Sequence, residues 1–264
     1  MSTEAFDSVK IARDSKRPTG LDYIHAIFRE FFELHGDRRY ADDAAIVGGV
    51  AYLGKKPVTV IAIEKGHSIK ERNARLSGAP HPEGYRKALR LMQQADKFKR
   101  PIICFVDTSG AYCGIGAEAR GQGQAIAENL VTMMGFKVPI ISIFIGEGGS
   151  GGALALGVAN RVWMLEHAVY SVISPEGCAS ILWKDAKKAD VAADNLKLTA
   201  QDAYRFGFTE KIISEKDLGS RIFYKDLEKM LIDELEILSK ENDLSESRYQ
   251  RFREIGKLYT EELQ

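Results

Sequence analysis

Cysteine is scarce in this sequence of 264 residues, and Cys104, Cys113 and Cys178 show no CxxC spacing. Such a set argues against both a disulfide framework and a structural zinc site. Cys104 lies in an apolar run, where a thiol usually serves packing. A basic surplus is also absent, because 37 Lys and Arg balance 37 Asp and Glu. We therefore expect no metal in this chain, and neither nucleic acid nor an anionic membrane as its partner.

Long apolar runs are missing as well, since 18 consecutive apolar residues occur nowhere. We expect no membrane-spanning helix. The first residues lack the basic and apolar segments of a secretory leader, so the expected location is cytoplasmic. The hydrophobic share of 45% is ordinary for a globular protein. We expect a polar N-terminal arm over residues 1–20 and a single domain over residues 21–264, helical from about residue 220.

What the sequence does contain is a glycine-rich segment after a β-branched apolar run. Residues 140–145 are typical of a buried strand, residues 146–152 hold five glycines, and small apolar residues resume at Ala153. This order predicts a strand, a turn of nearly bare backbone, and a helix. Unpaired N–H groups at a helix N-terminus favour negative charge, so the turn is a candidate anion or oxyanion site.

Two nucleotide-binding motifs can be compared with this turn. Gly146, Gly148 and Gly151 match the spacing of a dinucleotide fingerprint, and Glu166 lies about where a ribose-binding acid belongs. A phosphate-binding P-loop is excluded, because Ala153 stands where that motif needs lysine. The dinucleotide hypothesis therefore stays open on a weak motif.

The same turn also has the Gly-x-Ser-x-Gly spacing of a nucleophile elbow at Ser150, which requires a histidine base. His167 is the only histidine that follows, and it is too close in sequence for a typical triad. The remaining chemistry is an oxyanion hole without a nucleophile, in which backbone N–H groups hold charge on a carbonyl or ureido oxygen. The alternative without chemistry is that the glycines only permit close packing of helix on strand.

Ahead of the glycine turn, helical and strand patterns alternate. The expected elements are a helix over residues 21–35, strands over 45–53 and 57–64 joined as a hairpin, and a helix over 82–98. The basic residues of the arm, such as Arg13, are expected to be solvated. Residues 36–43 form a charged loop. The basic loop over residues 65–82 is either a mobile surface or a clamp for an anionic substrate.

A second unit repeats the order of strand, glycine loop and helix. Pro101-Ile102-Ile103 recurs as Pro139-Ile140-Ile141, 38 residues later, and each run enters a strand. The helix of the first unit is expected over residues 118–134. This repetition predicts stacked ββα turns whose two glycine loops meet at one site. Asp107 ends the first strand, where it caps the loop or serves as a base; capping is the commoner role.

A further helix N-terminus is indicated by Ser174-Pro175-Glu176-Gly177, with a capping Ser, a Pro in the first helical position and an acid in the first turn. The other expected elements after the glycine turn are strands over residues 161–165, 169–173 and 210–214, and helices over 185–196, 199–206 and from 220.

Taken together, these motifs resemble the α subunits of bacterial acetyl-CoA carboxylase carboxyltransferase, a family of the crotonase/ClpP superfamily. The resemblance covers residues 17–215 and rests on segments 33–38, 45–49, 82–92, 146–153 and 170–177, with a similar tail at 248–253. It implies an α/β fold, a crotonase/ClpP-like ββα superhelix with additional N- and C-terminal helices.

The resemblance also implies an activity and an assembly. Members transfer a carboxyl group from carboxybiotin, held on a separate biotin carboxyl carrier protein, to acetyl-CoA, giving malonyl-CoA for fatty acid synthesis. The implied partner is a β subunit in an α2β2 assembly, with biotin carboxylase in the full complex and the zinc site on β. In the family, two glycines at a helix start supply N–H groups to an oxyanion, which corresponds here to Gly151 and Gly152.

The candidate substrate-binding residues surround those two donors in three segments: Gly148, Gly149, Ser150, Gly110, Ala111, Tyr112, Gly114, Ser174, Glu176 and Gly177. Two loop positions depart from the family pattern, with Ser109 and Cys113 where proline is common. The alternatives are a stand-alone hydratase or isomerase acting on an acyl-CoA, and a non-catalytic scaffold that binds the β subunit.

Overall fold

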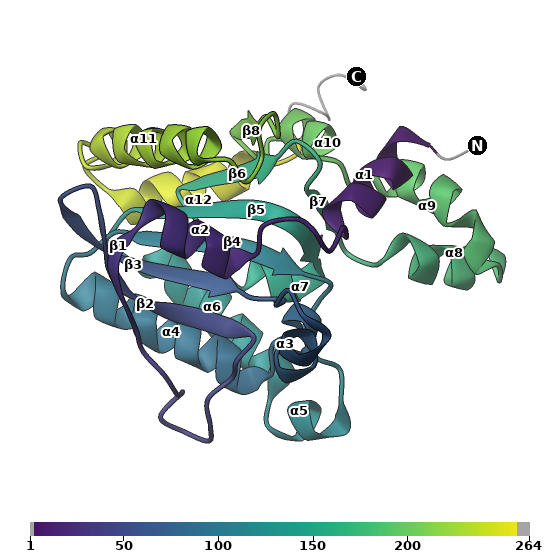
Figure 1. Ribbon diagram of the computed structural model, residues 1–264, viewed down its shortest axis with the longest axis horizontal. Helices are drawn as coiled ribbons and strands as arrows, with labels where there is room; N and C mark the ends of the chain where they lie inside the picture. The colour runs from purple at the N-terminus through teal and green to yellow at the C-terminus, as the bar shows by residue number, and fades with distance from the viewer. Residues whose placement is uncertain (1–2, 258–264) are drawn as a thin grey trace.

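The computed structural model describes residues 3–257, which form one eight-stranded sheet with helices on both faces (Figure 1). The strand order is β1-β2-β3-β4-β5-β6-β8, and β7 pairs with the end of β5. The strands are β1 (Arg29–Glu33), β2 (Ile46–Leu53), β3 (Lys56–Ile63), β4 (Ile102–Thr108), β5 (Ile140–Gly149), β6 (Arg161–Leu165), β7 (Val169–Ser171) and β8 (Lys211–Ile213).

The helices follow the same chain order. They are α1 (Glu4–Ala12), α2 (Gly20–Ile27), α3 (Ile69–Ala74), η1 (Leu76–Gly78), α4 (Pro82–Lys97), α5 (Ile115–Ala119), α6 (Gln122–Gly135), α7 (Ser150–Leu154), α8 (Pro175–Trp183), η2 (Ala186–Lys188), α9 (Ala189–Leu196), α10 (Ala200–Arg205), α11 (Arg221–Leu238) and α12 (Leu244–Glu254). Helices α4 and α6 pack together, as do α2 and α11, and Figure 1 shows α2 in front of the sheet. None of the helices in the described part of the chain is both long and apolar enough to cross a membrane.

The predicted repeat is confirmed as two neighbouring parallel strands. Ile102 of β4 lies opposite Ile140 of β5, and Ile103 lies opposite Ile141, so the two Pro-Ile-Ile runs are in register. Every residue of β4 is buried, as expected of a parallel strand covered on both faces. Because the strands are parallel, their carboxyl ends place the loops after β4 and β5 side by side. The predicted hairpin of β2 and β3 is confirmed as well.

The predicted helix over residues 21–35 is wrong in its second half. Helix α2 ends at Ile27, Phe28 takes an extended backbone, and the chain continues as the edge strand β1. Gly49 of β2 permits this pairing, because a Cβ there would collide with the carbonyl of Phe32. Hydrogen bonding to the edge of a formed sheet therefore overrides the helical spacing of the aromatic residues.

Three other boundaries differ from the prediction because of single backbone features. Gly121, with φ 82°, divides the helix predicted over residues 118–134 into α5 and α6. The loop predicted over residues 65–82 contains α3, started by a capping box of Ser68 and Glu71. Strand β5 runs through the first glycines as far as Gly149, so the turn itself is shorter than predicted.

The N-terminal residues pack against the chain. Helix α1 contacts α9, β5 and β7, and α1 and α9 lie side by side at the right of Figure 1. Val9 and Ala12 of α1 form a small buried cluster with Val169, Ala193 and Leu198. The arm therefore connects the projecting pair α8 and α9 to the end of β5.

The family-like tail is explained by a buried arginine. Arg248 of α12 is 0% exposed, and its guanidinium donates to the carbonyls of Met133, Met134, Phe136 and Val138 and to Asn160 Oδ1. Burial lowers the pKa of Arg248 to about 10, so it stays charged at neutral pH. The side chain thus satisfies carbonyls at the end of α6 and joins the tail to the core.

Replacing Arg248 with methionine should lower the free energy of unfolding by about 2 kcal/mol or more, because several buried carbonyls lose their donor. The corresponding fall in Tm is about 4–8 °C for a chain of this size, measured by thermal unfolding. The matched control is Arg253→Met on the same helix, where the side chain is exposed. Equal Tm values for the two variants would contradict the anchoring role.

Candidate active site

The glycine turn presents backbone donors at the start of α7. Ser150, Gly151 and Gly152 are the first three residues of this helix, so their N–H groups have no acceptor within it. No side chain caps the helix start. Ser150 has a φ of 49°, which turns the chain sharply between β5 and α7. The predicted turn of bare backbone is therefore confirmed, with its bend at Ser150.

The two glycine loops meet, as the repeat predicts. A Cβ on Gly149 would collide with the carbonyl of Ser109, and a Cβ on Gly152 would lie 2.6 Å from the amide nitrogen of Ala111. Gly110, with φ 143°, takes a backbone conformation that side chains disfavour. Glycine is thus required at these positions for close approach of the two main chains.

The loop after β4 is fixed by hydrogen bonds, although it lacks the prolines of the family pattern. Thr108 Oγ1 donates to the carbonyl of Gly110 and accepts from the Gly110 N–H. Gln122 Nε2 donates to the carbonyls of Pro80 and Tyr112, each at 2.8 Å. The Tyr112 N–H also donates to the carbonyl of Pro80. Side chains of β4 and α6 therefore supply the stiffness that proline would give.

A small cavity that opens to solvent lies beside the turn. Four predicted site residues line it, namely Gly148, Gly149, Ser150 and Ser174. Glu176 and Gly177 adjoin it in the first turn of α8, where the Ser174 hydroxyl accepts from the Gly177 N–H.

The other predicted residues lie behind or away from this cavity. Gly151 is partly exposed and faces Ile126, whereas Gly152 is buried under the loop after β4. Gly110 and Ala111 contact the turn through their backbone. Tyr112 instead packs its ring on His81, at 4.5 Å between centroids, and Gly114 packs against the Tyr112 ring. The structure therefore places Tyr112 and Gly114 on the outer side of their loop.

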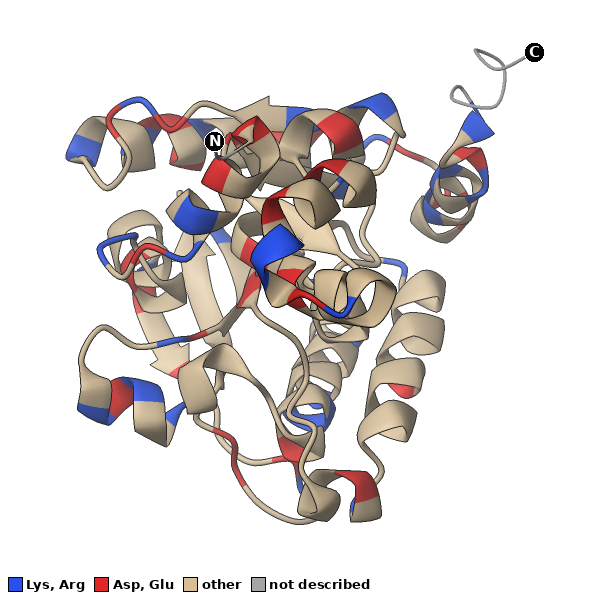
Figure 2. Cartoon of the chain, turned by 90° about the vertical axis from the view of Figure 1, so that its right-hand side faces the viewer, with Lys and Arg blue, Asp and Glu red and all other residues tan. Residues whose placement is uncertain are grey.

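A chain of alternating charges borders the turn. Lys65 Nζ lies 2.6 Å from Asp107 Oδ1 and 3.2 Å from Glu147 Oε1. Arg13 joins Glu147 to Glu176, with both contacts at 2.7 Å. The Asp107 carboxylate also accepts the N–H of Glu147 at 2.8 Å. These contacts connect the ends of β4 and β5 to the arm and to α8. Figure 2 shows acidic and basic residues intermixed on this side of the protein.

Sequence reasoning missed how these charged residues pair with one another. Arg13 was expected to be solvated, but it bridges two carboxylates. Lys65 was expected in a mobile or substrate-clamping loop, but its side chain is only 18% exposed and pairs within the chain. Asp107 was expected to cap its own loop or to serve as a base, but its carboxylate accepts the N–H of Glu147 in the neighbouring strand β5 and pairs with Lys65. Lys65 and Asp107 could have been paired from their positions just after adjacent parallel strands; Arg13 gives no such signal.

The network holds its ionised forms over a wide pH range. Burial alone would raise the pKa of Glu147, but the charge of Lys65 and the hydrogen bond from Arg13 outweigh burial and lower it. Burial opposes the lowered pKa of Glu176 too, and the Arg13 hydrogen bond overcomes it. For Lys65, burial would lower the pKa, but Asp107 and Glu147 raise it.

The directions of these pKa shifts predict the pH at which the N-terminal arm detaches. Carboxylates with lowered folded pKa stabilise the structure above their ordinary value of 4.5 and lose that contribution as the pH falls through the folded pKa. Lys65, with a raised folded pKa, stabilises below its ordinary 10.5 and loses that contribution at higher pH. The protection factors of the α1 amides, which correct hydrogen exchange for its intrinsic pH dependence, should therefore stay constant from about pH 5 to pH 10 and fall below about pH 4. An Arg13→Gln variant should exchange faster already at neutral pH; unchanged exchange there would contradict the arm's attachment.

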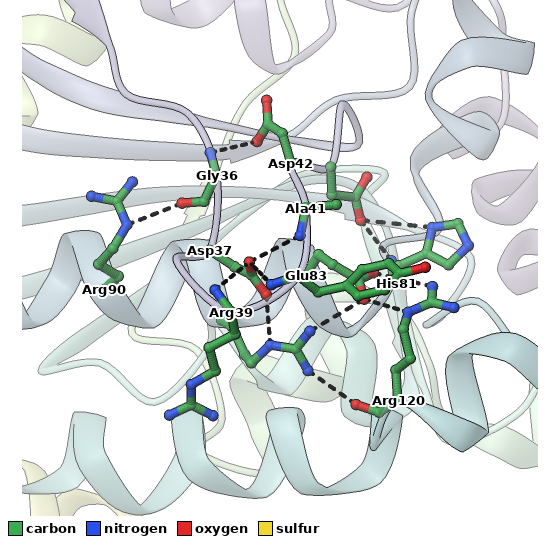
Figure 3. Close-up of polar contacts among 12 residues, drawn as sticks. Gly36, Asp37, Arg39, Ala41, Asp42, His81, Glu83, Arg90 and Arg120 are labelled. Atoms are coloured by element: carbon green, nitrogen blue, oxygen red, sulfur yellow. Dashed lines mark hydrogen bonds and ion pairs between the residues drawn. The ribbon is translucent and has the colours of Figure 1, made fainter.

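A second charged cluster forms the wall behind the loop after β4 (Figure 3). The Asp37 carboxylate accepts the N–H groups of Arg39, Tyr40 and Ala41 and the side chain of Arg86. Glu83, from the Pro-Glu-Gly-Tyr motif, pairs with Arg86 and Arg120. The charged loop over residues 36–43 is therefore held by contacts within the chain.

The rival chemistries find little support here. None of the described residues lining the cavity is a histidine, so Ser150 has no base for a nucleophilic triad. Glu166, the candidate ribose acid, accepts from the Ser214 hydroxyl and the Glu215 N–H. A metal site is absent too: the described residues contain no group of three or more His, Cys, Asp or Glu side chains suited to one. The backbone N–H donors of the glycine turn are therefore the remaining feature of this site that can act chemically.

Comparison with known proteins gives consistent family matches. The family model described as "Acetyl co-enzyme A carboxylase carboxyltransferase-like" matches residues 2–256. A relative from Ruminiclostridium cellulolyticum, named acetyl-coenzyme A carboxylase carboxyl transferase subunit alpha, is 57% identical over 96% of this chain and 98% of its own length. A relative from Natranaerobius thermophilus, named subunits beta/alpha, is also 57% identical over 96% of this chain, which spans 43% of that longer protein.

Solved structures agree on the fold. Transcarboxylase 12S matches with a TM-score of 0.70 at 21% identity, over 91% of this chain and 45% of that one. A Pseudomonas malonate decarboxylase hetero-tetramer in complex with coenzyme A gives 0.70 at 19% identity, over 93% and 100%. At these identities the structures establish the fold alone, and they confirm the predicted crotonase-like α/β class.

Proposed function

The chain belongs to the family of acetyl-CoA carboxylase carboxyltransferase α subunits, and from this premise we propose that its glycine turn is the oxyanion site of carboxyl transfer. The activity of the family is transfer of a carboxyl group, and the relatives named as α subunits, one of them fused to β, support a β partner for this chain. The observation that carries the site proposal is the start of α7, where Gly151 and Gly152 offer N–H groups without helical acceptors.

The backbone N–H donors of the turn fit carboxybiotin, the group that the family implies. Carboxybiotin, when bound, supplies the activated carboxyl group and requires donors for the negative charge left on its ureido oxygen. Gly148 and Gly149 line the cavity with main chain, and the absence of a Cβ lets them pack against the rings of Phe144 and Tyr170 and the carbonyl of Ser109. Gly151 and Gly152 then hold the developing charge through their amides, an interaction worth about 3 kcal/mol of barrier per donor.

The rest of the chain keeps this donor pair rigid. Close contact of Gly149 and Gly152 with residues 109–111 fixes the position of the turn against the loop after β4. The ion pairs of Lys65 hold the ends of β4 and β5, from which the two loops begin. Such preorganised amides need no rearrangement when charge develops, which is the source of their catalytic effect. Ser174 and Glu176 close the α8 side of the cavity, with Glu176 bound to Arg13.

The proposed assembly follows from the way in which the family divides the reaction between its subunits. The β subunit would hold most of the acetyl-CoA and the zinc site, and the biotin carboxyl carrier protein would deliver carboxybiotin between α and β. Biotin carboxylase would complete the enzyme, in the cytoplasm. A relative in which β and α form one chain supports this pairing, since fusion keeps the two halves together.

The test is malonyl-CoA formation from carboxybiotin and acetyl-CoA by this chain, its β partner, and both together. Turnover that requires both chains supports the proposal. Hydration of an enoyl-CoA by this chain alone would instead support the stand-alone hydratase. Co-purification with β without malonyl-CoA formation would identify a non-catalytic scaffold.

A further inference from the structure

A buried tyrosine lies directly beneath the glycine turn. Tyr85 of α4 is 0% exposed, and its hydroxyl has no hydrogen-bond partner among the described residues. The hydroxyl oxygen lies 2.8 Å from the place that a Cβ on Gly152 would occupy, and the Ala111 amide nitrogen lies 2.6 Å from the same point. The hydroxyl, the Ala111 amide and Gly152 therefore meet at one position.

The surroundings of this hydroxyl are otherwise apolar. Tyr85 packs with Ala125 and Ala155, and Ala111 and Ile126 complete the cluster. The ring of phenylalanine would make the same apolar contacts, and buried polar groups in proteins nearly always have a partner. Packing alone thus explains the ring of Tyr85 and leaves its oxygen unexplained.

The hydroxyl stays neutral. Burial, and secondarily the charge of Asp43, raise the pKa of Tyr85 far above its ordinary value. Tyr85 therefore serves as a fixed neutral dipole at any pH where the enzyme works, and it is not a proton-transfer group.

Polar side chains nearby already position the same backbone. Gln122 holds the loop at Tyr112, and Asn129, which is 0% exposed, donates to the carbonyl of Ala155 just after α7. Helices α4 and α6 thus form a layer whose polar atoms face the two glycine loops. Tyr85 is the member of this layer that reaches Gly152.

We propose that Tyr85 is a positioning residue for carboxyl transfer, whose hydroxyl fixes the Gly152 and Ala111 backbones at the spacing the oxyanion site requires. The inference rests on the proposed role of the turn. The hydroxyl oxygen of Tyr85 packs against Gly152, so removing it leaves a gap of one atom beside the residue that carries the amide donor. A displacement of a fraction of an ångström is enough to reduce catalysis, because the donors must point at the position of the developing charge.

The experiment compares Tyr85→Phe with Tyr23→Phe in the assembled α–β enzyme. Tyr23 is the matched control, because it is also 0% exposed with an unpartnered hydroxyl but packs on Phe105 and Phe223 in the core. We expect Tyr85→Phe to lower kcat about 10- to 100-fold, with the KM for acetyl-CoA, the shape of the pH profile and the Tm unchanged. Tyr23→Phe should leave kcat unchanged.

Two results would overturn the inference. Wild-type kcat in Tyr85→Phe would show that the hydroxyl does nothing for the reaction. A kcat loss accompanied by a Tm fall of several degrees would show that the hydroxyl only supports the fold. The double variant with Gly151→Pro separates this inference from the proposed function: if the turn is the site, the two effects are less than additive, and if Gly151→Pro alone is without effect, the site proposal itself fails.

Discussion

Replacing Gly151 with proline should lower kcat of the assembled enzyme about 100- to 1000-fold, because the variant lacks one N–H donor at the oxyanion position. Proline is tolerated in the first turn of a helix, where its missing N–H has no helical partner. Gly151 suits the test better than Gly152, since a Cβ at Gly151 would make only an ordinary 3.6 Å contact with Ile126. Malonyl-CoA formation at saturating substrates measures the effect.

The control for this prediction is Gly151→Ala, which adds the Cβ and keeps the N–H. We expect Gly151→Ala to retain most of its kcat and its affinity for β. If both variants lose activity equally, the steric change and not the donor is responsible. If the proline variant folds, binds β and turns over normally, the backbone of Gly151 takes no part in the reaction.

Replacing Lys65 with methionine should produce the largest loss of stability, about 3–5 kcal/mol, because two carboxylates lose their shared cation. Asp107 and Glu147 have side chains only 9% and 13% exposed, so removing the lysine leaves two largely buried carboxylates without the cation they share. The expected fall in Tm is about 10 °C. Activity should fall too, since both carboxylates sit where β4 and β5 lead into the glycine loops.

The pH dependence of this variant gives an internal check. Protonated Glu147 needs no cation, so the stability difference between wild type and Lys65→Met should shrink as the pH falls below the ordinary carboxyl value of 4.5 toward the lowered folded pKa of Glu147. Lys70→Met, on the exposed surface of α3, is the matched control and should leave Tm unchanged. A Tm for Lys65→Met within a degree of wild type would show that the pairs contribute nothing.

The elements that sequence reasoning predicted correctly are those that local pattern determines. The runs that became β3, β4 and β5 are apolar and β-branched, and the glycines after Ile145 announce the turn by composition alone. The helix start at Ser174 carries its own capping side chain, and the start at Pro82 has proline in the first helical position. Each of these signals lies within a few residues of the feature that it predicts.

The features that sequence reasoning missed depend on distant partners. Strand β1 forms because the edge of β2 offers unpaired backbone groups. Within residues 29–33 themselves, the helical spacing is the stronger signal, so the sequence alone predicts a helix there. Arg13 reaches Glu147 across 134 residues, and Lys65 reaches it across 82. The unpartnered hydroxyl of Tyr85 becomes visible only when α4 lies beneath α7. Long-range contacts of this kind leave no periodicity in the sequence.

The most direct measurement is a structure of this chain assembled with its β subunit and biotin. The account predicts the ureido oxygen of biotin within about 3 Å of the amide nitrogens of Gly151 and Gly152, with Gly148 and Gly149 along the ring. An oxygen held by other groups, with those two amides facing acceptors of the protein itself, would contradict it.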